Sequence, residues 1–320
     1  MSLVRTFERE GGKYLFLDEV HKYPGWAQEL KNIYDNYPSL KIVFTGSSLL
    51  EILNARADLS RRAVVYTMQG FSFREFIGLE AGVHLDRLTF DQIAKNHIEE
   101  AQKINEAIKP FQYFNQYLKY GYYPFYKEQL DLFEQRLGEV INMILEIELP
   151  LLRNVDVAYV SKVKQLLLII AEPVPFTLNI SKISDKIGIS RITLLNYIHY
   201  LDEIGLTHNL FKNANGISKL QKPTKIYLEN TNLAFLLARG NTNKGNLRET
   251  FFSNQLRYRL MLEYTDSGDF LVDDIFTFEI GGKEKSNKQI KSIENGFVVS
   301  DDILYGFQNK IPLWLFGFLY

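Results

Sequence analysis

The chain has 320 residues, of which 46% are hydrophobic and 14% aromatic, and this predicts a globular protein of two or more domains. Lys and Arg (37) balance Asp and Glu (38), so the chain as a whole has no strong electrostatic attraction to nucleic acid or membrane. The absence of cysteine excludes disulfides, thiol catalysis and cysteine-based metal sites. Neither a signal peptide nor an apolar stretch long enough to span a bilayer is apparent, so we expect a cytoplasmic protein without a membrane partner.

Two short apolar runs near the N-terminus each end in polar residues. The run YLFL ends in Asp18 and Glu19, and the run KIVF ends in Thr45 and, two residues later, Ser47. Buried parallel strands have this pattern when they present polar side chains at their carboxyl ends. For the acidic pair the alternative is a solvated strand tip, and for Ser47 it is the N-cap of a following helix.

From residue 14 to residue 77 the sequence resembles the second half of an AAA-type P-loop ATPase domain. In particular, it is similar to the prokaryotic AAA ATPases that carry a C-terminal domain of unknown function. The segments that carry the resemblance are, in order, YLFLDEVHKYPGW (Walker B), KIVFTGSSLLEI (sensor 1) and ADLSRRAVVYTMQGFSFREF, which holds a candidate arginine finger.

The resemblance implies ATP and Mg²⁺ as ligands of the intact protein. It implies that Asp18 holds the Mg²⁺ shell and that Glu19 orients the attacking water. Thr45 and Ser47 are then candidates to contact the nucleotide, and Arg62 is the candidate to reach a phosphate. The alternative for Arg62 is a surface ion pair with Asp58.

No G-x-x-x-x-G-K-[ST] segment occurs in the sequence. A P-loop with its strand and helix needs roughly 25 residues upstream of Asp18, and 17 are present. We therefore expect a truncated ATPase, inactive as given but active in an intact protein. The alternative is a non-enzymatic scaffold that uses the remnant fold for assembly.

Residues 72–152 predict a helical lid, with helices over 71–80, 91–107, 111–120 and 127–148 and a break at Pro150. Residues 153–222 predict a winged helix: helices over 160–171, 180–187 and 191–204, the last capped by Ser190, then strands over 206–212 and 217–220. DNA contacts would come from four residues of the recognition helix, Arg191, Thr193, Asn196 and Tyr197. Because that helix carries one strong cation, any nucleic-acid binding would be weak, and partner docking is the favoured alternative.

The segment 223–320 resembles the C-terminal domain of the same family, a distant relative of restriction-endonuclease folds. Strands are predicted over 224–228, 268–272, 275–280 and 296–299, and helices over 232–237, 247–263 and 288–293. A metal-dependent nuclease needs two carboxylates and a lysine, and the candidates are Glu249, Asp269, Glu279 and Lys283. Functional members carry Glu-x-Lys, whereas two glycines separate Glu279-Ile280 from Lys283 here. The alternative is a set of solvated strand tips.

The predicted fold is therefore α/β. It comprises a partial P-loop ATPase sheet (1–71), a helical lid (72–152), a winged helix (153–222) and a restriction-endonuclease-like domain (223–320). Loss of the P-loop strand would leave an open edge on the strand at 41–45. We expect either that a strand over 63–68 pairs there or that another chain covers the edge in a homo-oligomer.

Overall fold

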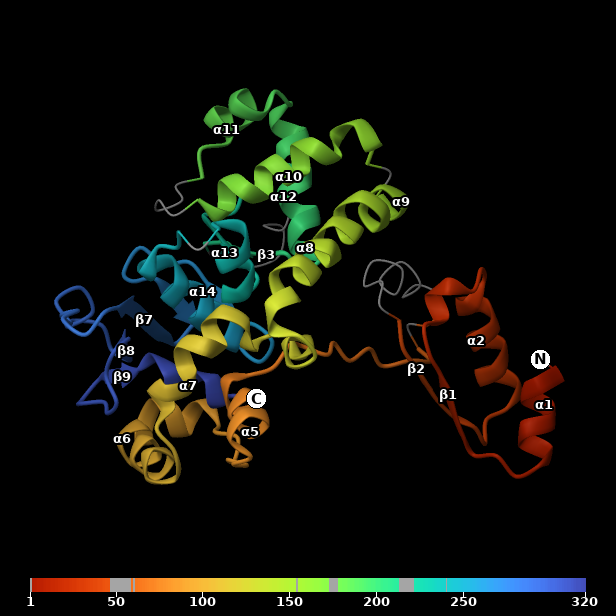
Figure 1. Cartoon of the computed structure of the whole chain (residues 1–320), viewed down its shortest axis with the longest axis horizontal. Helices are drawn as coiled ribbons and strands as arrows, with labels where there is room; N and C mark the ends of the chain where they lie inside the picture. The colour runs from red at the N-terminus through yellow and green to blue at the C-terminus, as the bar shows by residue number, and fades with distance from the viewer. Residues whose placement is uncertain are drawn as a thin grey trace. The chain divides into compact units, whose positions relative to one another are not determined.

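The computed structural model describes residues 2–46, 59, 61–153, 155–172, 178–212, 222–239 and 241–320. The chain forms two compact units (Figure 1). The N-terminal unit comprises Met1–Met68 and Glu146–Val157, and the C-terminal unit comprises Gln69–Leu145 and Ala158–Tyr320. Both the helices and the strands of the α/β class are present.

The N-terminal unit is built on two parallel strands, β1 (Tyr14–Leu17) and β2 (Lys41–Phe44). The helices α1 (Ser2–Arg9) and α2 (Trp26–Asn36) flank them in the sequence, and a single 3₁₀ turn, η1 (Val20–Lys22), follows β1. The two strands were predicted, and the structure confirms them.

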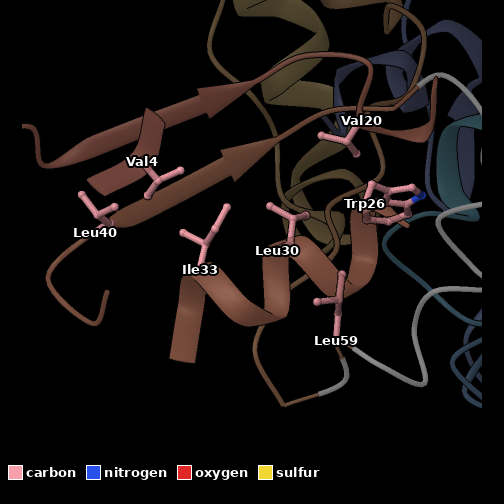
Figure 2. Close-up of a cluster of buried hydrophobic side chains, with 7 residues drawn as sticks. All are labelled: Val4, Val20, Trp26, Leu30, Ile33, Leu40 and Leu59. Carbon is pink, nitrogen blue, oxygen red and sulfur yellow. The ribbon is translucent and has the colours of Figure 1, made fainter. Parts of the chain in front are cut away.

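One face of this small sheet packs on the two helices (Figure 2). Leu30 and Ile33 of α2 point toward the strands, whose inward side chains include Leu15 and Ile42. The buried residues of this cluster are Val4, Val20, Trp26, Leu30, Ile33, Leu40 and Leu59. Tyr34 of α2 lies outside this cluster and is 48% exposed.

The other face of the sheet carries exposed apolar side chains. Tyr14, Phe16 and Val43 are 57%, 72% and 49% exposed, so the prediction of strands buried on both faces is wrong for the described residues. The reason is that both helices pack on the same face, and the period of two along a strand leaves alternate residues uncovered.

The prediction of a strand over residues 63–68 is also wrong. These residues have no regular structure, and in the part of the chain that the structure describes β2 pairs with β1 alone. The segment starts in a turn in which the N–H of Ala63 donates to the carbonyl of Leu59 (2.9 Å). Arg62 is bound to Asp35 of α2, which holds the start of the segment against the helix rather than along β2.

The C-terminal unit begins with a helical region whose helices follow the predicted order. α5 starts with a capping box, in which Ser72 and Glu75 satisfy each other's backbone N–H groups. The elements are α5 (Phe73–Ala81), α6 (Phe90–Ala107), α7 (Pro110–Gln116), the π-helix η2 (Tyr117–Gly121), the 3₁₀ helices η3 (Pro124–Lys127) and η4 (Leu130–Leu132), and α8 (Phe133–Met143).

The single helix predicted over 127–148 is divided. It consists of η4, α8 and a π-helix, η5 (Ile144–Glu148), and α9 (Leu149–Arg153) continues beyond it. Pro150 does not end this helical stretch, because it is the second residue of α9.

Three helices and a two-stranded sheet follow. The helices are α10 (Val157–Ala171), α11 (Ile180–Ile187) and α12 (Arg191–Glu203), and Ser190 caps α12 as predicted. β3 (Thr207–Leu210) pairs in antiparallel fashion with β4 (Lys225–Leu228), Thr207 lying opposite Leu228. The predicted strand over 217–220 lies outside the described residues. The β3–β4 sheet therefore joins segments on either side of the boundary predicted at residue 222.

A five-stranded sheet forms the rest of the C-terminal unit, in the order β5-β6-β7-β8-β9 (Figure 1). The pairs β5–β6 and β6–β7 are antiparallel, and the pairs β7–β8 and β8–β9 are parallel. The strands are β5 (Leu262–Glu263), β6 (Phe270–Val272), β7 (Phe276–Gly281), β8 (Gly296–Ser300) and β9 (Lys310–Pro312). The helices that accompany them are α13 (Thr231–Leu237), α14 (Lys244–Leu256) and the 3₁₀ helix η7 (Leu313–Phe318).

Two predicted helices differ here. The helix expected over 247–263 ends at Leu256, and residues 262–263 are strand β5. Residues 288–293, expected to be helical, form successive turns with i to i+3 hydrogen bonds, such as Ile293 N–H to the carbonyl of Ile290 (3.0 Å). They connect the adjacent parallel strands β7 and β8, and turns take the place that a helix commonly has in such a connection.

The region predicted as a lid is part of the C-terminal unit's core. The rings of Phe73 on α5 and Phe318 on η7 meet edge to face at 6.1 Å, and Arg74 Nε donates to the carbonyl of Tyr320 at 2.9 Å. Within the described residues, no helix combines the length and the hydrophobicity needed to cross a membrane.

Candidate functional site

The carboxyl ends of β1 and β2 bring Asp18 and Thr45 together. Because the strands are parallel and in register from Tyr14–Lys41 to Leu17–Phe44, the residues that follow them meet at one edge of the sheet. The Thr45 hydroxyl donates a hydrogen bond to Asp18 Oδ1, and the N–H of Glu19 donates to Thr45 Oγ1 (3.2 Å). Three of the predicted site residues therefore form one hydrogen-bonded group.

Glu19 has a left-handed backbone conformation, with φ 53° and ψ 41°. This conformation is costly for a residue with a Cβ, and strained residues of this kind cluster at functional sites. The N–H of Val20 donates to the Thr45 carbonyl (3.0 Å), so the backbone on either side of Glu19 is fixed to β2. Its carboxylate pairs with Lys22 Nζ at 2.9 Å on the surface.

Arg62 does not join this group. Its Nε and Nη2 donate to the two carboxylate oxygens of Asp35 on α2 at 2.9 and 3.0 Å. This hydrogen bonding lowers the pKa of Asp35 and raises that of Arg62. Ser47 and Asp58 lie outside the described residues, so the predictions for them are untested.

A cavity of about 550 Å³ lies next to β2 in the same unit. All four residues of β2 line it, together with Arg62 and the irregular segment from Ala63 to Tyr66. The candidate arginine therefore borders the same cavity as β2, the strand that Thr45 follows.

In the C-terminal unit, Glu249 and Asp269 converge on a lysine that the sequence did not single out. Lys225 Nζ lies 3.3 Å from Glu249 Oε2 and 3.1 Å from Asp269 Oδ1. The Tyr227 hydroxyl donates to Glu249 Oε2 (2.6 Å), and the N–H of Ile280 donates to Asp269 Oδ2 (2.8 Å). Lys225 and Tyr227 alternate along β4, so a period of two could have indicated that they share a face.

The pKa values of Glu249 and Lys225 are shifted by burial and by the neighbouring charges. Burial and the charge of Asp269 raise the pKa of Glu249. Burial acts to lower the pKa of Lys225, but the two carboxylates outweigh it and raise that pKa. Lys225 is thus held as an ammonium ion between the acids.

Glu279 and Lys283 are not part of this group. Glu279 is buried and pairs with Lys285, and Lys283 is exposed and accepts a hydrogen bond at its carbonyl from Lys310 Nζ (3.0 Å). Lys285 lies over Gly281, where a Cβ would come within 2.6 to 2.7 Å of its side-chain carbons. Among the described residues, no three His, Cys, Asp or Glu side chains are placed to hold a metal ion.

The four residues predicted to contact DNA differ in accessibility. Arg191 and Asn196 are exposed on α12, whereas Tyr197 is 6% exposed and packs inward. The N–H of Thr193 is bound by the cap residue Ser190 (3.1 Å), and the two hydroxyls are 2.8 Å apart. Two of the four are thus available to a partner without rearrangement.

A pair of parallel strands with acidic and hydroxyl residues at their carboxyl ends is typical of α/β cores that bind and hydrolyse nucleotides. Comparison with known proteins agrees for the N-terminal part: residues 2–77 match the model of an AAA domain, so this part of the chain is AAA-like. Residues 111–244 match a domain of unknown function (DUF8612).

An uncharacterized protein of Methanocaldococcus jannaschii is similar in sequence to this chain. The two are 24% identical over 318 residues, which cover 90% of this chain and 67% of the archaeal protein. No solved structure matches the chain. These similarities support an AAA-like protein; the winged-helix and nuclease-like domains and the four-domain division stay predictions.

Proposed function

We propose that the N-terminal unit is the part of an AAA-type ATPase site that positions water and magnesium. The observation that carries this proposal is the hydrogen-bonded group of Asp18, Glu19 and Thr45 across the ends of two parallel strands. On this proposal the chain hydrolyses ATP only in a protein that also supplies a phosphate-binding loop, since backbone N–H groups and a lysine of such a loop grip the triphosphate.

The residues present suit a magnesium ion held through its water shell. Carboxylate and hydroxyl oxygens are the ligands that Mg²⁺ takes in nucleotide sites, and Asp18 and Thr45 supply one of each. Bound Mg²⁺ would neutralise charge on the phosphates. Asp18 would orient the ion's water ligands, and the Thr45 hydroxyl would fix the direction of that carboxylate.

Glu19 would act as the residue that orients the attacking water. Its backbone is anchored through its own N–H to Thr45, and its carboxylate pairs at the surface with Lys22, whose side chain is 71% exposed. An exposed ion pair of this kind contributes little free energy. The carboxylate can therefore exchange Lys22 for a water molecule at small cost.

In this proposal Arg62 dissociates from Asp35 and contacts a phosphate of the nucleotide. Its guanidinium is 28% exposed and borders the cavity beside β2. Ser47 is proposed as a further nucleotide contact on the strength of the sensor-1 resemblance alone.

Two measurements test the proposal. Calorimetry on residues 1–320 should show no saturable Mg·ATP binding at submillimolar nucleotide, because two adjacent carboxylates without a loop lysine repel a triphosphate. In a longer version that includes a phosphate-binding loop, Glu19→Gln should slow hydrolysis about 100-fold or more while ATP affinity is kept.

Glu10→Gln is the matched control, since Glu10 is exposed on the segment before β1 and lies outside the site. Its hydrolysis rate should equal that of the unchanged protein. Hydrolysis by Glu19→Gln at the unchanged rate would contradict the role of Glu19. No hydrolysis by the longer protein itself would favour the alternative of a scaffold.

The geometry does not favour the nuclease alternative. The Lys225 ammonium lies between Glu249 and Asp269, in the position that a metal shared by the two carboxylates would need. Glu279, the remaining candidate carboxylate, is bound to Lys285.

A further inference from the structure

A cavity of about 270 Å³ lies in the C-terminal unit, apart from the proposed ATPase residues. Its walls come from the end of α10, from β4 and from the starts of α13 and α14. Ile170, Leu228, Ala234 and Leu247 supply apolar surface. The volume corresponds to roughly nine water molecules, which suits a small organic molecule rather than a nucleotide.

One carboxylate oxygen in this cavity lacks a donor. Glu249 lines the cavity, and both its hydrogen-bond donors, Lys225 and Tyr227, contact Oε2. Among the described residues, none donates a hydrogen bond to Oε1. A half-buried carboxylate with an unmatched oxygen favours a ligand that brings N–H groups.

The charge around the cavity also favours a cation. Lys225 is closer to Asp269 (3.1 Å) than to Glu249 (3.3 Å), and Asp269 is not among the described residues that line the cavity. Lys225 lines the cavity together with Glu249, and because this one lysine serves two acids, the group of Lys225, Glu249 and Asp269 carries about one net negative charge. Burial and Asp269 raise the pKa of Glu249, as expected for a carboxylate without a full counter-charge.

We propose that this cavity binds a small protonated primary amine, with its ammonium group on Glu249 Oε1 and its alkyl chain on the apolar walls. The ammonium offers three donors to an acceptor that has none, and its charge completes the neutralisation of the two acids. The apolar walls select an alkyl chain over a hydrated inorganic ion.

Butylammonium, titrated into the full chain by calorimetry at constant ionic strength, is the first probe. We expect saturable binding with a dissociation constant in the millimolar range, about the affinity available to so few atoms. 1-Butanol, which matches the chain but lacks the charge, should bind at least about tenfold more weakly.

Two variants test separately the charge of Glu249 and the free volume of the cavity. Glu249→Gln keeps the shape and removes the charge, so it should weaken butylammonium binding at least about tenfold. Ala234→Leu keeps Glu249 but fills the cavity, and it should abolish binding. Glu294→Gln, an exposed acid in the β7–β8 connection, is the matched control and should bind as the unchanged chain does.

Circular dichroism checks that each variant is folded. Equal binding of 1-butanol, unchanged binding by Glu249→Gln, or the absence of saturable butylammonium binding to the unchanged chain would overturn the proposal. Saturable binding of Mn²⁺ that Glu249→Gln abolishes, without amine binding, would overturn it in favour of a metal site. None of these results bears on the ATPase proposal, which concerns the other unit.

Discussion

At the scale of single residues, the strongest electrostatic feature is a carboxylate buried in the C-terminal unit. Glu229 pairs with Arg257, accepts a hydrogen bond from the Tyr258 hydroxyl (2.5 Å), and is contacted by Asn254 Nδ2 (3.3 Å). Burial nevertheless outweighs the charge of Arg257 and raises the pKa of Glu229 to about 7. The folded protein therefore holds a proton there that the unfolded chain releases near pH 4.5.

This difference makes stability depend on pH in a definite direction. The contribution of Glu229 to the free energy of unfolding is fully present below about pH 4.5 and is lost as pH rises through about 7. Glu229→Gln cannot titrate, so the free energy of unfolding of the unchanged protein, minus that of the variant, should fall by on the order of 3 kcal/mol across this window. Denaturant titrations at several pH values measure it.

The measurement uses the difference in free energy of unfolding between the unchanged protein and Glu229→Gln, because another residue changes the stability with pH in the opposite direction. Burial lowers the pKa of His208 well below its usual value, so its contribution to stability is lost as pH falls. His208 is present in both proteins, and its effect cancels. A difference that stays constant with pH would contradict the raised pKa of Glu229.

Part of the candidate site could be predicted from the sequence, and part could not. Asp18 and Thr45 follow two apolar runs, and the rule that parallel strands end at one edge is enough to bring them together. Arg62 lies at a predicted position, but its partner Asp35 is 27 residues away and depends on how α2 packs. The ion pairs of Lys225 could not be predicted either, because Glu249 and Asp269 lie on elements that are distant from it in the sequence.

At the scale of elements, an asparagine supports the π-helix η2. Asn232 Nδ2 donates to the carbonyls of Tyr117 (3.1 Å) and Leu118 (3.0 Å), and Asn232 Oδ1 accepts from the N–H of Tyr122 (2.9 Å). A π-helix disrupts the regular i to i−4 bonding and needs such outside partners. The side chain is 1% exposed, so water cannot replace it.

Asn232→Asp should therefore destabilise the C-terminal unit by about 3 kcal/mol or more. The change preserves the shape but replaces the two N–H donations with a carboxylate facing two carbonyl oxygens. Asn196→Asp, at an exposed position of α12, is the control and should change the free energy of unfolding by less than about 0.5 kcal/mol. Equal effects of the two substitutions in denaturant titrations would show that Asn232 does not support η2.

Most helices and strands were predictable, and the errors share a physical cause. α11 and α12 follow from their periodicity and caps, which are local. The segment 63–68 has the β-branched and aromatic composition of a strand, but Arg62, bound to Asp35 of α2, fixes its start away from the edge of β2. Residues 288–293 were predicted as a helix but form turns in the connection between β7 and β8, and nothing in the local sequence distinguishes the two.

At the scale of the whole molecule, the two units differ in how much structure supports them. The N-terminal unit has a two-stranded sheet with one apolar face exposed, whereas the C-terminal unit has a five-stranded sheet and an extensive aromatic core. Sheets of two strands are marginal, and small cores bury proportionally less surface. We expect the N-terminal unit to unfold first.

Hydrogen exchange followed by mass spectrometry at increasing denaturant measures this order. Peptides covering β1 and β2 should lose protection at a lower denaturant concentration than peptides covering β7 and β8. Asn232→Asp should move the second transition toward the first and leave the first in place. Simultaneous loss of protection in both sets of peptides would contradict two independently stable units.

The position of Lys285 over Gly281 has a consequence for the protein's evolution. A lysine at position 281 would restore the spacing Glu-x-Lys, but its Cβ would lie 2.6 Å from the Lys285 side chain, which already neutralises Glu279. The two positions are therefore epistatic: a lysine is accommodated at 281 only if 285 first gives up its own. Moving the lysine from position 285 to position 281 therefore needs paired substitutions, because the intermediate that lacks both lysines leaves Glu279 buried without this counter-ion.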